Sequence, residues 1–251
     1  MPIYIDVHCH LDMCNDLDDI IVKSKENKIR ILSNGVNIKS NRFHVNLKKE
    51  NPNIKIALGL YPIDALELSD KEIDEEIQYI KKLNKNDQVV SAIGEVGLDF
   101  KFDKDNMERQ INIFEKFILL SKELDIPIIV HSRKAEIECI ELLEKNNVKK
   151  VIMHCFSGKK KLVQRIEKNG WFLSIPTNIV NSTQFQDNAK NVSLNNLFCE
   201  TDAPYLHPFK EQNNKPYLVV EAYKKIAEIK GITIDELKNL IFLNWQRIFK
   251  D

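Results

Sequence analysis

The 251-residue sequence has few of the features that mark several common classes of protein. It contains 7 glycines and no Gly-rich loop after its first apolar run, which argues against an open, doubly wound nucleotide-binding sheet. The 5 cysteines are odd in number and show no Cys-x-x-Cys spacing, which argues against a disulfide framework and fits a reducing compartment. No apolar run approaches membrane-spanning length, and the start has no basic segment followed by an apolar one. These absences predict a soluble, cytoplasmic protein without a membrane partner.

The charge is balanced, with 37 Lys and Arg residues against 37 Asp and Glu residues. A protein that coats nucleic acid without sequence preference usually carries a basic excess, so a nucleic-acid substrate would have to be held by a local site. No Pro-, Gly- or Ser-rich stretch suggests a linker, and 43% hydrophobic residues are enough for one sizeable core. We therefore expect a single domain over residues 1–251 and no obligate protein partner.

Short apolar runs rich in β-branched residues alternate with longer amphipathic runs from end to end. The expected strands cover residues 3–8, 30–33, 54–58, 89–93, 127–130, 150–153, 171–174 and 195–200. The clearest helical patterns cover residues 105–123, 134–145, 216–230 and 234–249. Thr233 is the expected N-cap of the last helix, with Glu236 as its capping-box partner. Continuously apolar strands are typical of parallel sheets, so the alternation predicts an α/β fold, a (β/α)8 TIM barrel.

Two histidines, His8 and His10, end the first apolar run. Residues i and i+2 of an extended strand point to the same face, so the two imidazoles can bind one divalent metal there. A His-x-His pair also arises by chance or as exposed polar positions, so the pair alone does not establish a metal site.

Four later strand-like runs also end in His, Glu or Asp. The residues at these ends are Glu95, His131, His154 and Asp202. Catalytic groups of a (β/α)8 barrel sit at the C-terminal ends of its strands, so all six residues would share one rim. Each one singly can be a capping or surface residue, but together they predict a metal site.

The sequence around these residues resembles the TatD family of metal-dependent hydrolases, in the amidohydrolase-like barrel superfamily. The matching stretches occur in the family's order at residues 5–12, 93–100, 130–135, 153–158 and 200–206. The resemblance implies two divalent metal ions and nuclease activity on DNA. It implies that the first ion is held by His8, His10 and Asp202, the second by His131 and His154, and that Glu95 bridges them.

Two stretches depart from the family's usual pattern. Where the family usually shows Gly-x-His-Pro, residues 59–62 read Gly-Leu-Tyr-Pro, and where it often has Arg-Asn-x-Pro, residues 213–216 read Asn-Asn-Lys-Pro. Tyr61 can hydrogen-bond a phosphate oxygen, but it cannot replace a cationic or metal-binding imidazole. These departures bear on substrate preference and leave the implied metal ligands intact.

The implied ligands are four imidazoles and two carboxylates, a set that suits Zn, Mn, Co or Fe at least as well as Mg. Two ions about 3.5–4 Å apart can share a water, lower its pKa and stabilise both the attacking and the leaving oxygen. Asp202 is the expected base, and Glu95 is the second expected catalytic residue. Glu200 lies on the same strand face as Asp202 and can orient a ligand imidazole, although a packed acid is the alternative.

Several other side chains beside the expected ligands suit a nucleic-acid substrate. Arg133 is the best candidate for a cation that holds a phosphate, with an ion pair on the rim as the alternative. Phe100, Phe156 and Tyr205 can stack on bases or simply pack the loops. The expected substrate is therefore DNA, single-stranded or at its ends.

Three functions remain open from the residues. The leading hypothesis is a deoxyribonuclease, either a 3′–5′ exonuclease or an endonuclease that cuts at abasic sites. The alternative is acyl hydrolysis by the same metal pair, as in an amidohydrolase, a lactonase or a D-aminoacyl-tRNA deacylase. A non-enzymatic metal-binding protein is disfavoured because all six ligands are present. A structural Zn site usually has four Cys and His ligands at short sequence spacings.

Overall fold

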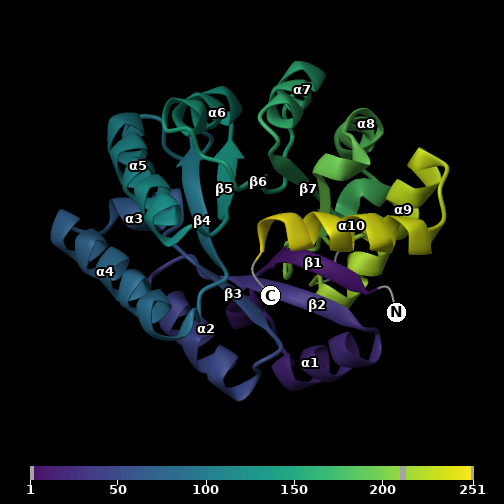
Figure 1. Ribbon diagram of the computed structural model, residues 1–251, viewed down its shortest axis with the longest axis horizontal. Coiled ribbons are helices and arrows are strands. Elements are labelled where there is room, and N and C mark those ends of the chain that lie inside the picture. Colours follow the sequence, from purple (N-terminus) through teal and green to yellow (C-terminus); the bar gives the residue numbers. More distant parts are fainter. Residues whose placement is uncertain (1–2, 210–212, 250–251) are drawn as a thin grey trace. The chain divides into compact units, whose positions relative to one another are not determined.

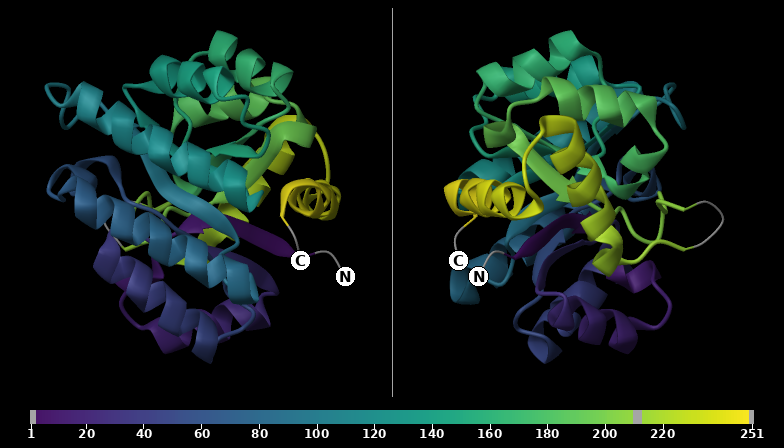
Figure 2. Two further views of the ribbon diagram at one scale, coloured as in Figure 1. Left: turned by 60° about the vertical axis from the view of Figure 1, so that its left-hand side comes forward. Right: turned by 90° about the vertical axis from the view of Figure 1, so that its right-hand side faces the viewer.

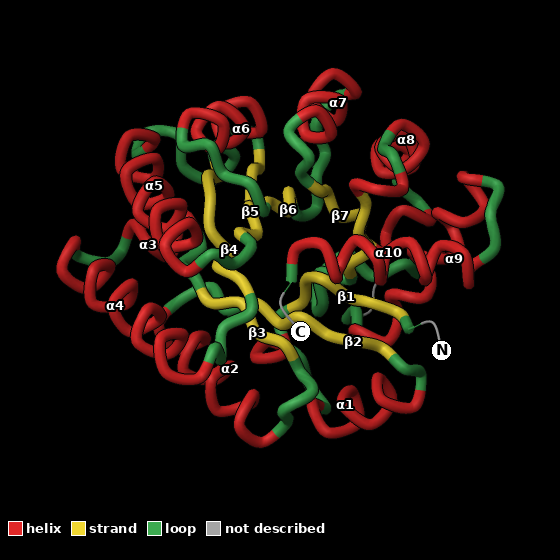
Figure 3. The backbone as a smooth tube through the Cα atoms, in the orientation of Figure 1, coloured by secondary structure: helices red, strands yellow, loops and turns green. Residues whose placement is uncertain are grey.

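The computed structural model describes residues 3–209 and 213–249 of the chain. Eight strands alternate with helices along it, as Figure 3 shows in yellow and red. The chain divides into two compact units, which we call unit 1 (Met1–Ser33 and His154–Phe249) and unit 2 (Asn34–Met153). The expectation that residues 1–251 form a single domain stays a prediction.

Unit 1 combines the beginning of the chain with its last third. Its strands are β1 (Tyr4–Cys9), β2 (Ile29–Asn34), β7 (Phe172–Pro176) and β8 (Leu197–Glu200). Its helices are α1 (Leu17–Glu26), α7 (Lys160–Lys168), α8 (Thr183–Asn191), α9 (Val219–Lys230) and α10 (Ile234–Ile248), with short 3-10 turns at η1 (Leu11–Met13), η2 (Thr177–Val180), η3 (Leu194–Asn196) and η4 (Pro216–Leu218). Strand β1 pairs in parallel with β2, β7 pairs in parallel with β8, and β8 lies beside β1.

Unit 2 is formed by the continuous middle of the chain. Its strands are β3 (Lys55–Leu58), β4 (Ala92–Asp99), β5 (Ile128–Arg133) and β6 (Val151–Met153), and each pairs in parallel with the next. Its helices are α2 (Ile38–Glu50), α3 (Pro62–Leu66), α4 (Asp70–Asp87), α5 (Met107–Leu124) and α6 (Glu136–Lys145). The long helices α4 and α5 lie side by side (Figure 2).

The apolar strands are buried along their length, as expected of a parallel sheet covered on both faces. Every residue of β4, β7 and β8 is buried. In unit 1, helix α10 packs against β1 (Figure 1), and its Trp245 is fully buried. The predicted capping box at the start of α10 is confirmed, since Thr233 and Glu236 bond each other's backbone N–H groups at 3.2 and 2.7 Å.

Strand β4 differs from its prediction, because it runs over Ala92–Asp99 rather than residues 89–93. Glu95 therefore lies inside the strand, next to an irregularity in the β4–β5 register, instead of just beyond it. Gly97 explains how the strand continues. A Cβ at this position would lie 2.0 Å from the carbonyl oxygen of His131, so only glycine lets the two backbones come this close. His131 likewise lies within β5.

The observed order of elements confirms the predicted α/β class and the alternation of a (β/α)8 barrel. Among the described residues, no helix is long and apolar enough to cross a membrane. The five cysteines all lie in the described ranges and form no disulfide bond there.

Candidate metal centre

In unit 1, the end of β1 is tied to the segment that follows β8. The Asp202 N–H donates to the His8 carbonyl at 2.9 Å, and the His10 N–H donates to the Ala203 carbonyl at 2.7 Å. These two backbone bonds bring the Asp202 carboxylate next to the two imidazoles, although the residues are almost 200 positions apart.

Asp6 strengthens the same connection from inside the protein. Its fully buried carboxylate accepts hydrogen bonds from the Thr201 N–H at 2.8 Å and the Thr201 hydroxyl at 2.6 Å. Burial raises the pKa of Asp6 well above its usual value, although the bonds from Thr201 oppose this. Sequence reasoning missed this role. Its signal was an acidic residue inside an otherwise apolar strand.

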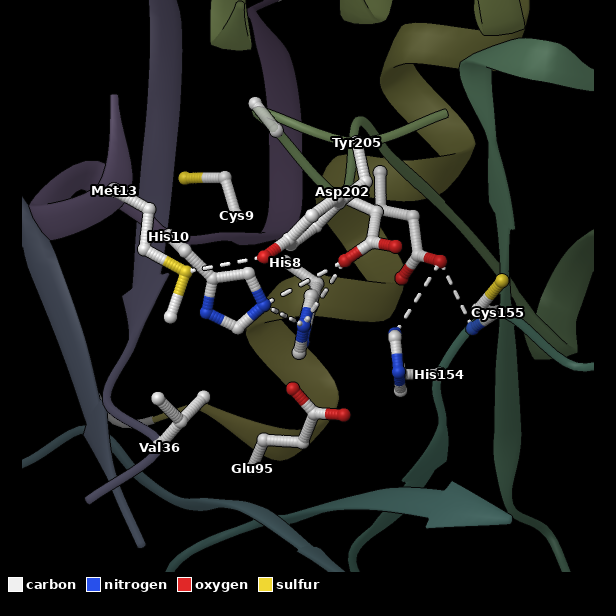
Figure 4. A network of polar contacts seen from close by, with 12 residues as sticks. His8, Cys9, His10, Met13, Val36, Glu95, His154, Cys155, Asp202 and Tyr205 are labelled. Carbon is white, nitrogen blue, oxygen red and sulfur yellow. Dashed lines mark hydrogen bonds and ion pairs between the residues drawn. The ribbon is translucent and has the colours of Figure 1, made fainter. Parts of the chain in front are cut away.

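Three polar atoms converge at this place in unit 1 (Figure 4). His8 Nε2 lies 3.2 Å from His10 Nε2, and Asp202 Oδ1 lies 3.6 Å from each of these nitrogens. His154 stacks on His8 with a centroid separation of 3.9 Å and an interplanar angle of 18°. Potential ligand atoms of His8, His154 and Asp202 all lie within 4.8 Å of one another.

The spacing of these atoms fits a divalent cation. Ligand nitrogens lie about 2.0–2.1 Å from a tetrahedral Zn ion, which places neighbouring ligand atoms about 3.4 Å apart. The distances of 3.2 and 3.6 Å among His8, His10 and Asp202 bracket that value. Imidazole nitrogens and a carboxylate oxygen are also donors that Zn, Mn, Co and Fe accept.

Asp202 is held as an anion in a strained backbone. Burial alone would raise the pKa of its carboxyl group, but interactions with His10, His154 and His8 outweigh that effect and keep the pKa below its usual value. Its φ of 56° lies in the left-handed region, where a non-glycine residue is strained. Cys155, directly after His154, has a φ of 46°. Such strain is often stored at functional sites.

Glu200 supports the segment that carries His154. Its buried carboxylate accepts the Ser174 hydroxyl at 2.5 Å and the Cys155 N–H at 2.8 Å, and it lies 3.5 Å from His154 Nδ1. The shorter contacts fix the backbone after His154, so Glu200 positions that residue mainly through the turn. Ser174 was not anticipated from the sequence, since a serine in a buried strand carries no specific signal.

Within unit 2, polar contacts link Glu95, His131, Asp99 and Tyr61. The side chain of His131 lies between two carboxylates, with Nδ1 2.7 Å from Glu95 Oε1 and Nε2 2.9 Å from Asp99 Oδ2. The Tyr61 hydroxyl donates to the same Asp99 oxygen at 2.7 Å. In a neutral imidazole only one ring nitrogen carries a proton. If Nε2 carries it, Nδ1 and the Glu95 carboxylate both present lone pairs, as two ligands of one cation do.

Asp99 connects these polar contacts, and sequence reasoning did not identify it as a functional residue. Its other oxygen, Oδ1, accepts the backbone N–H groups of Lys101 and Phe102 at 2.9 and 3.0 Å. Burial tends to raise the pKa of Asp99, but hydrogen bonds from His131 and Tyr61 hold it below its usual value. The available signal was local, because an aspartate that ends a strand often bonds the backbone two residues on.

The two expected substrate contacts have defined surroundings in unit 2. Burial and the hydrogen bond to Asp99 raise the pKa of the Tyr61 phenol, so it stays protonated. Arg133 is exposed, and its guanidinium lies 5.0 Å from the centroid of the Phe102 ring. The assignment of both residues to substrate binding stays a prediction.

The fold and these groups of imidazole and carboxylate side chains define the chain as a metal-dependent hydrolase of the α/β class. A family model described as TatD related DNase matches residues 5–250. The chain is 32% identical to the uncharacterized metal-dependent hydrolase YabD of Bacillus subtilis, with 98% of each chain covered. It is 33% identical to the human protein named deoxyribonuclease TATDN3, with 98% of this chain and 94% of that protein covered.

A solved structure extends the likeness to the fold. The crystal structure of YJJV, a TatD homologue from Escherichia coli K12, matches with a TM-score of 0.89 and 25% identity over 98% of this chain and 97% of that one. The chain therefore belongs to the TatD family of metal-dependent hydrolases, as its motifs predicted, and it has the (β/α)8 barrel fold class of that family.

Proposed function

We propose that this protein is a metal-dependent deoxyribonuclease that hydrolyses phosphodiester bonds with water, either from a 3′ end or at abasic sites. The observation that carries the proposal is the convergence of His8, His10 and Asp202 at cation-ligand spacing. The description of the matching family and the name of the human relative support DNA as the substrate.

The proposed cofactor is a pair of divalent ions, as the family resemblance implies. We assign His8, His10 and Asp202 to one ion, His131 and His154 to the other, and Glu95 to both. The imidazole-rich donor set favours Zn, Mn, Co or Fe, with Mg as a weaker candidate. When bound, such ions lower the pKa of water and stabilise charge on phosphate oxygens.

The chain's own side chains divide the remaining tasks. The carboxylate of Asp202, which its lowered pKa keeps unprotonated, accepts the proton of the attacking water beside the reacting atoms. Glu200 holds the turn that carries His154, and Asp99 orients His131. Arg133 and Tyr61 are assigned to the phosphate, Arg133 through its fork of N–H donors and Tyr61 through its hydroxyl, which must turn from Asp99 to donate to a phosphate oxygen.

The proposal is tested with metal-stripped protein reloaded separately with Mn, Zn, Co or Mg. The substrates are end-labelled single-stranded DNA, a duplex with one abasic site, and D-aminoacyl-tRNA. Asp202→Asn, purified in the same way, shows whether any cleavage comes from a contaminating nuclease.

We expect metal-dependent DNA cleavage that this variant loses. A ladder from the 3′ end indicates an exonuclease, and one cut at the abasic site indicates an endonuclease. Release of the aminoacyl group without DNA cleavage would refute the proposal.

A further inference from the structure

One aromatic side chain beside the unit 1 cluster is exposed. Tyr205 lies three residues after Asp202, and 55% of its surface is accessible to solvent. The other two aromatic residues that the sequence suggested for stacking differ from it. Phe156 is completely buried, which favours packing over stacking among the two roles expected for it, and Phe100 is half-buried. A large exposed aromatic ring next to potential metal ligands invites a functional explanation.

The backbone that carries Tyr205 is fixed from several sides. The Tyr205 N–H donates to the Asp202 carbonyl at 2.8 Å. The Thr177 hydroxyl donates to the Leu206 carbonyl at 3.0 Å, and the Asn214 N–H donates to the Pro204 carbonyl at 2.9 Å. The position of Tyr205 relative to Asp202 is therefore set before any ligand arrives.

Asn214 contributes most to this support. It is 1% exposed, and its side-chain amide donates to the Thr201 carbonyl at 2.7 Å and to the Thr177 hydroxyl at 2.8 Å. It lies in the stretch where the sequence departs from the usual family pattern. The buried amide shows that this stretch still serves to hold the segment between Thr201 and Tyr205.

The ring itself is also held in place (Figure 4). The Tyr205 hydroxyl donates to the Met13 sulfur at 3.6 Å, and the ring meets His10 edge-on, with a centroid separation of 6.4 Å and an interplanar angle of 69°. Met13 comes from the turn just after β1 and is 38% exposed. The soft, polarizable thioether meets Tyr205 at its hydroxyl and is a group that contacts aromatic side chains favourably.

We propose that Tyr205, supported by Met13, is a stacking platform for a nucleobase of the strand whose phosphate lies at the His8–His10–Asp202 cluster. The proposal rests on the proposed function and names its substrate more closely. A base inside a duplex has both faces covered by its neighbours, so the platform favours single-stranded DNA or a frayed end. Every base has a π-face, so this platform selects for unstacked bases and not for a particular sequence.

The platform explains how a chain without net charge can hold DNA. Proteins that bind by phosphate contacts alone usually present a basic surface, and this chain has no excess of positive charge. Stacking on a ring fixed in advance adds affinity at little cost in conformational entropy.

The experiment uses the metal-loaded protein and a single-stranded oligonucleotide with 2-aminopurine, whose fluorescence falls on stacking, at each of the last three 3′ positions in turn. Wild type is compared with Tyr205→Ala, with Tyr205→Phe, which keeps the ring, and with Leu243→Ala. Leu243 is equally exposed at 55% but lies on α10, so it controls for loss of any exposed apolar side chain. Stopped-flow mixing records fluorescence before cleavage, and steady-state assays give KM and kcat.

We expect wild type, Tyr205→Phe and Leu243→Ala to quench at one position, and Tyr205→Ala to lose that quench. KM of Tyr205→Ala should rise about 5- to 150-fold, the loss of one stacked base, with a smaller change in kcat. If Tyr205→Ala cleaves DNA with wild-type KM and an unchanged quench, the platform is refuted while the nuclease proposal stands. If wild type cleaves no DNA, the proposed function fails, and the platform fails with it.

Discussion

The clusters in the two units arrange similar polar atoms in different ways. In unit 1, His8, His10 and Asp202 place ligand atoms 3.2–3.6 Å apart, the spacing found around a cation. In unit 2, both ring nitrogens of His131 face carboxylate oxygens at 2.7 and 2.9 Å, which are hydrogen-bond distances. The first arrangement is already spaced for an ion, whereas the second can hold a proton in its place.

This difference shows that the same residue types can have ligand atoms at a spacing close to that around a metal ion or farther from it. The unit 1 atoms need little movement to bind a cation. The contact between Glu95 and His131 must open from 2.7 Å toward the spacing of about 3.4 Å that two ligands of a tetrahedral ion have. Excess metal should therefore rescue damage that weakens binding in unit 2, but not damage to the proton acceptor in unit 1.

Glu95→Ala should have the largest effect, because the proposed shared ligand serves both ions. We expect activity to fall by at least about 10²–10⁴-fold, and the metal content to drop below two ions per chain. Elemental analysis together with a nuclease assay measures both. Glu75→Ala removes an exposed glutamate of the same unit and should behave as wild type. Two ions per chain in Glu95→Ala would show that Glu95 does not bridge them.

Asp202→Asn should damage turnover more than metal binding. Asparagine keeps an oxygen that can contact an ion, but its amide has no useful basicity near neutral pH. Loss of the proton acceptor should lower kcat about 10²–10⁴-fold at saturating metal. If excess Mn or Zn restores wild-type turnover, Asp202 serves only as a ligand, and the proposed distinction between the clusters fails on the unit 1 side.

Asp99→Asn tests the unit 2 side of the comparison. The neutral amide cannot accept hydrogen bonds from His131 and Tyr61 on one side and from the backbone on the other, so the imidazole loses its fixed orientation. Metal affinity or activity should fall about 10- to 100-fold, and excess metal should recover most of it. Asp103→Asn, at a half-buried aspartate of the following turn, is the control. Unchanged metal affinity in Asp99→Asn would show that Asp99 does not position His131.

The sequence predicted the alternation of strands and helices, because apolar runs of different length and period leave a clear pattern. It misplaced the end of β4, since Gly94 and Gly97 have low strand propensity and the pairing with β5 overrides it. Local propensity cannot show where two backbones need glycine in order to approach each other.

For the site, the sequence identified side chains at strand ends but not the residues that hold them. Asp6, Asp99 and Ser174 act through bonds to partners that lie far away in the chain or in a turn, so neither period nor spacing reveals them. The exposure of Tyr205 and the burial of Phe156 were likewise not predictable, because both rings follow a strand end and have similar local sequence contexts.

Arg133→Ala should have the smallest effect of the series. Arg133 is exposed, so the loss of a phosphate contact should raise KM for DNA about 2- to 10-fold, with a smaller change in kcat. Its contact with Phe102 offers a competing explanation, in which the guanidinium merely packs on the ring. At an exposed site, such a contact contributes only about 0.5–1 kcal/mol.

Phe102→Ala separates the two explanations, because it removes the ring and leaves the guanidinium. If Arg133 binds phosphate, KM should be higher in Arg133→Ala than in wild type. KM of that variant should also depend less on salt concentration than KM of wild type, since fewer counterions are released without the arginine. Phe102→Ala should then keep a KM near wild type and retain the wild-type salt dependence. If both variants raise KM equally and neither changes the salt dependence, Arg133 acts by packing on Phe102, and the unit 2 cluster lacks the phosphate contact assigned to it.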